Sequence, residues 1–369
     1  MIPYSKQNIT DEDLRAVSAV LQSDFLTQGP GVEAFEDSLK DYFAVKHAIA
    51  CSSGTAALHL SYASIGVCPQ TIGIVPAVTF SATANAFRYL GAEVRFCDVD
   101  QQTGLLCLDS LTSLLENIKP APCQCPILIA PVSFAGATAP LDELDGIAAK
   151  FGFRVIEDAS HSPGSTAQSK NGAYNSGSCI YSDAACLSFH PVKHICCGEG
   201  GAVLTNDHKL AKLARKLRSH GIERPFDDSH QSPWFYEQTE LGWNYRLTDF
   251  QAVLGQSQLS RLDAQLEKRR QLAANYVRSF SNSPFKECFE CPALLPGHSW
   301  HLFIIRFKQT GIRDKAHKYL KSRGITTQVH YVPLYRHPYY RERYGEAQLP
   351  GAEEFYQSCL SIPMFPALS

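Results

Sequence analysis

The sequence predicts an α/β fold, in which a mostly parallel sheet is flanked by helices and followed by a smaller α+β domain. Two observations predict the sheet: short apolar runs alternate with helical patterns up to residue 158, and small or polar residues follow several of the runs. The third observation is a change of pattern after about residue 250. With 369 residues, the chain is long enough for about two domains of roughly 150 residues each.

The N-terminal part alternates helices and strands in an order typical of parallel sheets. Its first helix combines an acidic first turn with apolar residues on one face. The expected helices span residues 11–22, 32–43, 56–66, 81–90 and 141–151. The expected strands span residues 48–51, 72–76, 93–98, 127–131 and 153–157.

The C-terminal part has a different pattern, which predicts a separate small domain. We expect a long charged helix at 259–277, a strand at 301–307, a helix at 312–323 and an extended segment at 326–331. The chain is therefore divided into an N-terminal arm, a large domain and a small domain, with the bounds 1–12, 13–250 and 251–369.

Composition excludes several classes of protein. The 34 lysines and arginines against 36 aspartates and glutamates give a net charge of −2, which excludes a nucleic-acid footprint over the whole protein. No apolar run approaches the roughly 18 residues that span a bilayer, and the polar start does not resemble a signal peptide. The 13 cysteines are scattered, and one CxxC at 288–291 and one CxC at 123–125 are weak metal signals. We expect a cytoplasmic protein with reduced thiols and no metal, membrane or nucleic-acid partner.

Candidate ligand-binding residues follow the strands of the predicted sheet. Ligands of parallel sheets bind beyond the carboxyl ends of the strands, which selects residues 52–55, 79–80 and 158–161. The segment CSSGTAAL (51–58) opens a helix whose free backbone N–H groups and dipole suit a phosphate group. The same Ser-Gly-Thr is also an ordinary helix cap, so this segment alone leaves both interpretations open.

Two further segments carry residues suited to chemistry. In LSFHPVKHICCGEGGAVL (187–204), Lys193 is flanked by apolar and small residues, and burial would leave a neutral amine that can condense with an aldehyde. A surface lysine before a tight turn explains that segment equally well. In FRVIEDASHSPGS (153–165), Asp158 ends an apolar strand, where a carboxylate can pair with a protonated pyridine nitrogen. The alternative is that Asp158 caps the next turn.

The three segments together fit one cofactor, pyridoxal 5′-phosphate, which needs a lysine, an acid and a phosphate site. At this point the sequence resembles the DegT/DnrJ/EryC1/StrS sugar aminotransferases, fold-type I pyridoxal-phosphate enzymes that act on nucleotide-linked keto sugars. The resemblance runs from about Pro3 to Pro366. The segments that carry it are SDFLTQGP (23–30), CSSGTAALHL (51–60), VTFSATANAF (78–87), IEDASHSPGS (156–165), SFHPVKHICCGEGGAV (188–203), RSHGI (218–222), ELGWNYRLTDFQAVLG (240–255) and QVHYVPLYRHPYY (328–340).

The resemblance implies a seven-stranded sheet and an activity. An amino group would pass from L-glutamate, leaving 2-oxoglutarate, to C4 of a nucleotide-linked 4-keto-6-deoxy sugar. Within the family the sequence resembles most the transaminases of pseudaminic acid biosynthesis, which act on a UDP-linked sugar. Another nucleotide or C4 stereochemistry, a dehydratase of the same fold and a non-catalytic regulator are the alternatives. Known dehydratase relatives replace the anchoring lysine, whereas Lys193 is present here.

The resemblance also implies a role for particular residues. Lys193 would anchor the cofactor, Asp158 would pair with its ring nitrogen and His161 would lie beside the ring. Phe80 would stack on the open face of the ring. The residues implied to hold the phosphate are Gly54, Thr55 and Ser188, together with Asn244 from the other subunit of a homodimer. The residues implied to line the sugar-nucleotide pocket are Tyr4, Asp24, Phe25, Leu26, Thr27, His330, Tyr331, Val332 and Pro333.

One departure from the family pattern lies close to the anchoring lysine. Cys196 and Cys197 stand where related sequences usually carry Thr-Thr, so two hydroxyl groups are replaced by thiols. Thiols near an aldehyde lead us to expect that thiol modification inactivates the protein.

Overall fold

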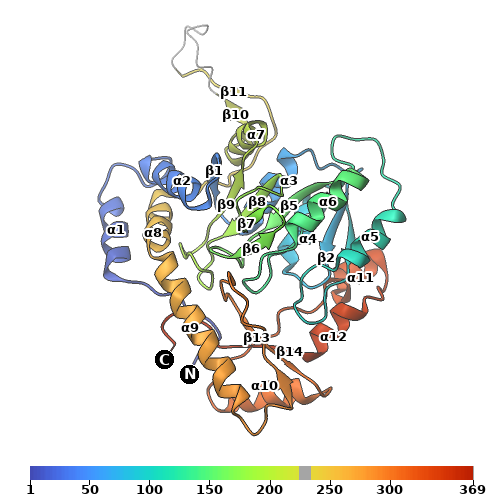
Figure 1. Cartoon of the computed structure of the whole chain (residues 1–369). Coiled ribbons are helices and arrows are strands. Elements are labelled where there is room, and N and C mark those ends of the chain that lie inside the picture. The colour runs from blue at the N-terminus through green and yellow to red at the C-terminus, as the bar shows by residue number, and fades with distance from the viewer. Residues whose placement is uncertain (224–233, 369) are drawn as a thin grey trace.

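The main sheet of the computed structural model, which describes residues 1–223 and 234–368, has seven strands in the order β1-β9-β8-β5-β4-β2-β3 (Figure 1). The strands are β1 His47–Cys51, β2 Ile72–Pro76, β3 Glu93–Cys97, β4 Ile127–Ile129, β5 Arg154–Asp158, β8 Ala184–Ser188 and β9 Gly201–Thr205. The pairs from β3 through β2, β4 and β5 to β8 are parallel, and β9 runs antiparallel between β8 and β1. The predicted mostly parallel, seven-stranded sheet is confirmed.

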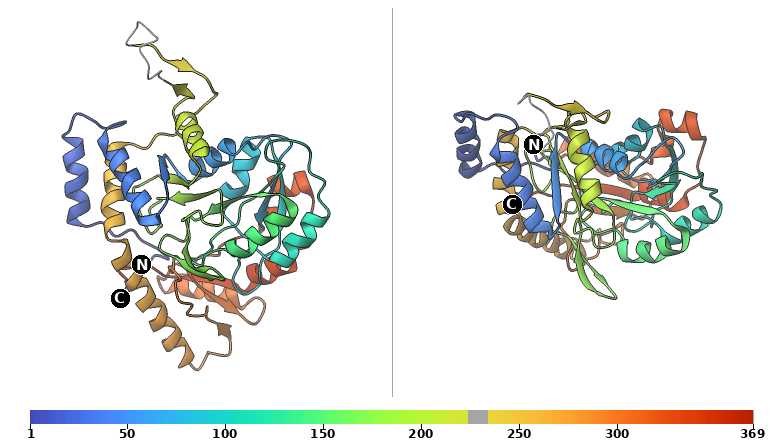
Figure 2. Two further views of the ribbon diagram at one scale, coloured as in Figure 1. Left: turned by 45° about the horizontal axis from the view of Figure 1, so that its top comes forward. Right: turned by 90° about the horizontal axis from the view of Figure 1, so that it is seen from above.

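Apolar side chains on both faces of the sheet explain why helices cover it on both sides (Figure 2). One face packs against α3 Gly54–Ser64, α4 Ser81–Tyr89 and α7 His208–Arg218. The other packs against α2 Pro30–Phe43, α5 Leu108–Glu116, α6 Leu141–Phe151 and α8 Asp249–Ser260. Alternation in β1 shows this directly, because Ile49 faces the first layer and Ala48 and Ala50 face the second.

The C-terminal part builds a second, smaller sheet next to the carboxyl edge of the main one. Strands β12 Phe289–Glu290, β13 Phe303–Phe307 and β14 Cys359–Ile362 pair antiparallel. Helices α9 Leu262–Ser281 and α10 Ile312–Ser322 cover one side of this sheet. The remaining C-terminal elements are the 3-10 helix Leu334–Arg336, α11 Pro338–Tyr344 and α12 Pro350–Ser358. α11 and α12 return to the large sheet, where Tyr340 packs edge-on against Phe96.

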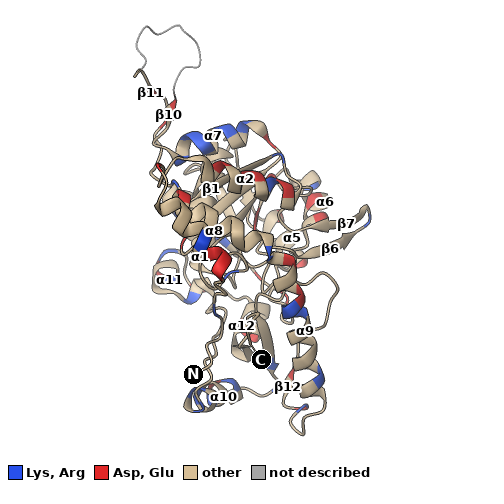
Figure 3. Ribbon diagram, turned by 90° about the vertical axis from the view of Figure 1, so that its left-hand side faces the viewer, with Lys and Arg blue, Asp and Glu red and all other residues tan. Residues whose placement is uncertain are grey.

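Shorter elements complete the chain. Helix α1 Asp11–Leu21 packs on α8, and two hairpins are formed by β6 Thr166–Ser169 with β7 Gly172–Asn175 and by β10 Ile222–Glu223 with β11 Glu237–Gln238. The N-terminal arm follows the small domain, since Ile2 bridges to Ile325. Lysine and arginine residues are frequent on α7, and acidic residues open α1 (Figure 3). In the part of the chain that the structure describes, no helix is long and apolar enough to cross a membrane.

The charged helix expected at 259–277 is observed as α9, but its predicted start is three residues early, because Ser260 still belongs to α8 and α9 starts at Leu262. Arg261 lies between them, and its guanidinium donates to the buried Asp13 carboxylate of α1 at 2.6 Å. This ion pair joins residues 248 positions apart, so no local pattern reveals it. The division of the chain near residue 250 stays a prediction; α8 packs on α1 and α2, and α9 continues to the small sheet.

Candidate active site

A cavity of about 590 Å³ lies at the carboxyl edge of the main sheet. Strands β1, β5 and β8 end there with Cys51, Asp158 and Ser188, as parallel topology requires. The cavity brings together residues selected from the sequence in six separate segments. Those residues are Tyr4, Gly54, Thr55, Phe80, Asp158, His161, Ser188, Lys193, His330 and Tyr331.

Lys193 lies in the turn that follows β8, where its backbone N–H donates to the carbonyl of His190 at 2.8 Å. Its side chain is half-buried and faces the cavity. Burial lowers the pKa of the Lys193 amine to about 8, although the nearby Asp158 carboxylate acts in the opposite direction. Half of the amine is therefore neutral near pH 8, and a neutral amine is the form that attacks an aldehyde.

The Asp158 carboxylate is buried and held by two hydrogen bonds. The Thr83 hydroxyl donates to Oδ2 at 2.8 Å, and the backbone N–H of Ser160 donates to Oδ1 at 3.2 Å. Thr83 has a single hydroxyl proton, so the hydroxyl of Thr79, 2.9 Å away, is the donor in the Thr79–Thr83 bond. These hydrogen bonds fix the carboxylate at the cavity wall, where it can accept a hydrogen bond from a protonated ring nitrogen.

His161 is buried beside Asp158 and is held in its neutral form. Burial places the pKa of His161 well below its ordinary value, and the charge of Lys193 acts in the same direction. The Tyr331 hydroxyl lies 3.2 Å from Nε2, whereas Nδ1 has no hydrogen-bond partner among the described residues. The ring of His301 lies 4.3 Å behind it. A neutral ring at this position can contact an aromatic ligand without adding charge.

The N-terminus of α3 forms the opposite end of the cavity and suits an anion. Ser53 caps the helix, accepting from the backbone N–H of Ala56 at 3.0 Å. The N–H groups of Gly54 and Thr55 precede the first helical hydrogen bonds and are free to bind a ligand. A Cβ atom at Gly54 would lie 2.8 Å from Cβ of Ser188, so only glycine allows β8 and α3 to approach this closely.

Several expected site residues lie outside this cavity of the same chain. The segment 24–27 is exposed, and Thr27 bridges to Thr248. Asn244 is exposed and pairs with Ser219 after α7. Val332 lines an adjoining groove, and Pro333 is buried beside it. The structure therefore does not bring 24–27 or Asn244 to the cavity of their own chain, and the phosphate and sugar contacts implied for them stay predictions.

The sequence does not reveal residues that act through others, and the reactivity expected of two thiols is not supported. No local motif marks Thr83 or His301, because their partners come from distant segments. Cys196 and Cys197 are buried, and burial raises the pKa of both thiols. Thiols that are buried and protonated react slowly, so the expected inactivation by modification of this pair is not supported.

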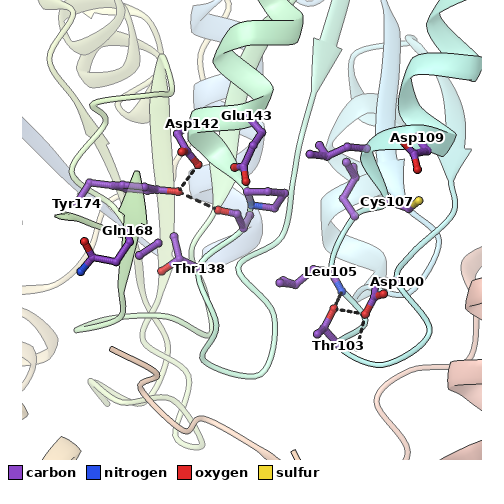
Figure 4. Close-up of a pocket in the computed structure, with 15 residues that line it drawn as sticks. Asp100, Thr103, Leu105, Cys107, Asp109, Thr138, Asp142, Glu143, Gln168 and Tyr174 are labelled. Atoms are coloured by element: carbon purple, nitrogen blue, oxygen red, sulfur yellow. Dashed lines mark hydrogen bonds between the residues drawn. The ribbon is translucent and has the colours of Figure 1, made fainter. Parts of the chain in front are cut away.

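A second cavity, of about 560 Å³, lies between the β6–β7 hairpin and the loops before α5 and α6 (Figure 4). Its lining includes Asp100, Asp109, Asp142 and Glu143, and the Tyr174 hydroxyl donates to Asp142 at 3.4 Å. Such an acidic wall repels a phosphate group, which makes this cavity unsuited to the cofactor. Among the residues placed by the structure, no group of three histidine, cysteine or acidic side chains could hold a metal ion.

Comparisons with known proteins agree with this geometry. The model of the family described as "DegT/DnrJ/EryC1/StrS aminotransferase family" matches residues 7–369. The chain is 36% identical over 365 residues to the UDP-4-amino-4,6-dideoxy-N-acetyl-beta-L-altrosamine transaminase of Campylobacter jejuni, covering 98% of this chain and 92% of that one. It is similar to Helicobacter pylori PseC, an aminotransferase involved in the biosynthesis of pseudoaminic acid, with a TM-score of 0.88, 30% identity and coverage of 100% and 95%. A putative sugar aminotransferase of Streptococcus pneumoniae, in its PLP form, has a TM-score of 0.87, 26% identity and coverage of 100% and 94%.

Proposed function

Because this chain belongs to the DegT/DnrJ/EryC1/StrS aminotransferase family, we propose that it is a pyridoxal-phosphate-dependent transaminase of a nucleotide-linked keto sugar. The observation that carries the proposal is the meeting of Lys193, Asp158 and the N-terminus of α3 in one cavity. The Campylobacter jejuni relative supports UDP-4-amino-4,6-dideoxy-N-acetyl-beta-L-altrosamine as the amino sugar and places the reaction in the same class. L-glutamate is the proposed amino donor, and 2-oxoglutarate the product that it leaves.

The residues present fit pyridoxal phosphate. Lys193 would hold the aldehyde carbon, and Asp158 would hold the proton of the ring nitrogen. The N–H groups of Gly54 and Thr55, with the Ser188 hydroxyl, would hold the phosphate. The Nδ1 atom of His161 is buried without a partner among the described residues and can accept or donate one further hydrogen bond.

Each step of the exchange needs a proton to move, and the chain supplies the groups that move and hold it. When bound, pyridoxal phosphate supplies a ring that accepts the electron pair left when a proton leaves the carbon next to nitrogen. Once the amine of glutamate has replaced Lys193 on the aldehyde carbon, the freed Nζ would take that proton from the α-carbon of glutamate and deliver it to the aldehyde carbon. In the second half of the cycle it would carry a proton from that carbon to C4 of the sugar. Asp158 would hold the ring-nitrogen proton in place, and the buried His161, whose pKa is lowered by burial, would lie at the same site without adding charge.

The proposal is tested on the purified holoenzyme. We expect a yellow protein whose visible absorbance is bleached by L-glutamate and restored by the keto sugar. Borohydride reduction followed by peptide mapping should label Lys193. Lys193→Ala should lower the rate by more than about 10³-fold, because covalent anchor and proton carrier are both lost. The pKa of about 8 predicts that covalent uptake of the cofactor by the apoenzyme falls as pH drops below 8.

A label on another residue, or an active Lys193→Ala protein, would overturn the assignment. The exact sugar is tested with a panel of UDP- and dTDP-linked 4-keto sugars, and NMR of the products reports the C4 stereochemistry. Conversion of the dTDP sugars in preference to the UDP sugars would contradict the proposed substrate while leaving the transaminase class intact.

We also propose that the working unit is a homodimer with shared sites. Asn244 and the segment 24–27 are exposed on the outside of their own chain, next to one another through the Thr27–Thr248 bridge. Phe25, Leu26 and Leu241 are exposed apolar side chains of the same two segments. A second copy seated on these segments would bury them and bring Asn244 to the phosphate end of its cavity.

A further inference from the structure

Two half-buried cysteines belong to neighbouring loops at the amino edge of the main sheet, opposite the edge that carries the coenzyme cavity. Cys68 lies in the loop that joins α3 to β2, and Cys123 lies in the loop that joins α5 to β4. Strands β2 and β4 pair in parallel with Ile72 opposite Ile127, and each cysteine precedes its own residue of that pair by four positions. The two loops therefore reach neighbouring strands at the same edge and in the same register.

Contacts between the two loops hold these cysteines close together. The Thr71 hydroxyl lies 3.7 Å from Sγ of Cys68 and donates to the Cys125 carbonyl at 2.7 Å, so one side chain bridges the loops. The Cys123 side chain makes a hydrogen bond with Cys68, and both residues are free thiols. Two thiols in contact at the surface are a pair that can be oxidised together.

The spacing of the loops suits a disulfide bond. A disulfide needs two Cα atoms about 4.4–6.8 Å apart, and paired strands lie about 4.8 Å apart. The loops keep a close approach beyond the strands, because a Cβ atom at Gly66 would lie 2.6 Å from Cδ of Gln124, the residue after Cys123. A bond between the cysteines therefore requires no rearrangement of the sheet.

Cys68 has the surroundings of a reactive thiol. Burial alone would raise the pKa of this thiol, but hydrogen bonds from Gln70, Thr71 and Cys123 lower it by more, so its pKa lies below that of an ordinary cysteine. The thiolate is the form that attacks an oxidant. Cys125 is the third cysteine of these loops, and burial raises the pKa of its thiol to about 12, so it stays protonated.

The other cysteine pattern of the chain, the CxxC at 288–291, is not suited to such a bond. Cys288 and Cys291 flank β12, and three residues of extended backbone put about 10 Å between them. That distance exceeds the roughly 7 Å limit between the Cα atoms of a disulfide. In the CxC, the Cys125 thiol donates to a backbone carbonyl of β4 at 3.8 Å, which leaves Cys123 to pair with Cys68.

We propose that Cys68 and Cys123 form a modification site at which hydrogen peroxide produces a reversible disulfide. The Cys68 thiolate attacks one peroxide oxygen, the O–O bond breaks, and hydroxide leaves as Cys68 becomes a sulfenic acid. The Cys123 thiol then attacks the Cys68 sulfur, the S–O bond breaks, and the hydroxyl leaves with the thiol proton as water. In sum, two thiols lose two electrons and two protons, and one peroxide is reduced to two waters. This inference is independent of the proposed function.

Peptide mapping tests the site on the full-length protein. The reduced protein is treated with a few molar equivalents of hydrogen peroxide, blocked with iodoacetamide and digested without reduction. Wild type should yield a peptide pair linked through Cys68 and Cys123, which dithiothreitol separates. Cys123→Ser should stop at the sulfenic acid of Cys68, which dimedone labels. Cys288→Ser is the matched control, because Cys288 is an exposed cysteine outside the pair and its loss should leave the link unchanged.

Thermal unfolding gives a second measurement. The bond would connect residues 55 positions apart and restrict the unfolded chain, so oxidation should raise the melting temperature of wild type by roughly 5 °C. Cys123→Ser should show no such rise. An oxidised wild type that melts lower would show that the loops must be distorted to form the bond, against the proposed geometry.

The mapping also defines what would overturn the proposal. A link between other cysteines, a link between two chains, or no link at all in wild type would show that Cys68 and Cys123 are not the reacting pair. Equal dimedone labelling of Cys68 in wild type and Cys123→Ser would show that Cys123 does not resolve the sulfenic acid. None of these measurements uses an amino donor or a sugar, so their outcome is separate from that of the transaminase assignment.

Discussion

The Thr83 hydroxyl orients the Asp158 carboxylate at the cavity wall, although no local sequence motif marks Thr83. Its hydroxyl donates to Oδ2 of Asp158 at 2.8 Å and accepts from Thr79. Without this donor, the buried carboxylate would rotate or bind a water molecule. Its oxygen would then no longer be aligned with the ring nitrogen of the cofactor. Thr83 is therefore a positioning residue rather than a catalytic one.

Thr83→Val should weaken binding of pyridoxal phosphate by about 10-fold, because a hydrogen bond to a charged group is worth roughly 1.5–3 kcal/mol. The valine keeps the approximate volume of the side chain and removes the hydroxyl that donates to Asp158 and accepts from Thr79. Absorbance titration of the apoenzyme with the cofactor measures the affinity. The control is Thr112→Val, whose hydroxyl bonds to the Leu108 carbonyl at 2.9 Å within α5. Equal affinities for the two variants would show that Thr83 does not orient Asp158.

The residues that could be predicted from the sequence are those whose chemistry is local. Lys193 stands out because apolar and small residues flank it, and Asp158 because it ends an apolar strand. Thr83 could not be predicted, because its partner lies 75 residues away and the bond exists only once α4 meets the end of β5. The contacts implied for Asn244 and for 24–27 need a second copy of the chain, and they remain predictions.

Among the elements, helices with one apolar face were predictable and those set by distant contacts were not. The expected helices at 11–22 and 141–151 agree with α1 and α6 to within one residue at their ends. The break between α8 and α9 falls at Arg261, whose ion pair with Asp13 cannot be seen from periodicity. Strand β8 has the sequence AACLS, in which all residues but the leucine are small and β-propensity is modest. It is a strand because it is buried between two layers of helices.

The start of α3 depends on the absence of a side chain at Gly54. Gly54→Ala would place Cβ 2.8 Å from Cβ of Ser188, and both residues lie on ordered elements, so either the helix or the strand end must move. The free N–H groups would then lose their alignment on the phosphate. We expect binding of pyridoxal phosphate to weaken by about 10-fold, since one charge-assisted hydrogen bond is worth roughly that factor.

Gly146→Ala provides the matched control for Gly54→Ala. Gly146 lies within α6, and a Cβ atom there meets nothing within 4 Å. Alanine should stabilise the helix by up to about 1 kcal/mol and raise the melting temperature without changing cofactor affinity. Thermal unfolding and absorbance titration of both variants decide the matter. Unchanged cofactor affinity in Gly54→Ala would show that the close approach of α3 to β8 is not needed.

On the surface of the whole molecule, exposed apolar side chains lie in the two segments that contain Thr27 and Asn244. Phe25 and Leu26 precede α2, and Leu241 precedes the strand-like segment that carries Asn244. These segments lie on the same side of the chain because Thr27 pairs with Thr248 and the Leu26 carbonyl accepts from the N–H of Asp249 at 3.0 Å. A symmetric contact through this face would place each copy's Asn244 toward the other copy's cavity.

Mixing two inactive proteins tests this arrangement directly. Lys193→Ala lacks the amine, and Asn244→Asp sets a carboxylate against the phosphate, so each homodimer should be inactive. When the two are unfolded together and refolded, a mixed dimer has one site with both changes and one site with neither. Half of the dimers are mixed and each has one intact site of two, which predicts about one quarter of wild-type activity. If each site used its own Asn244, both sites of a mixed dimer would carry one change, and the mixture would be as inactive as its parents.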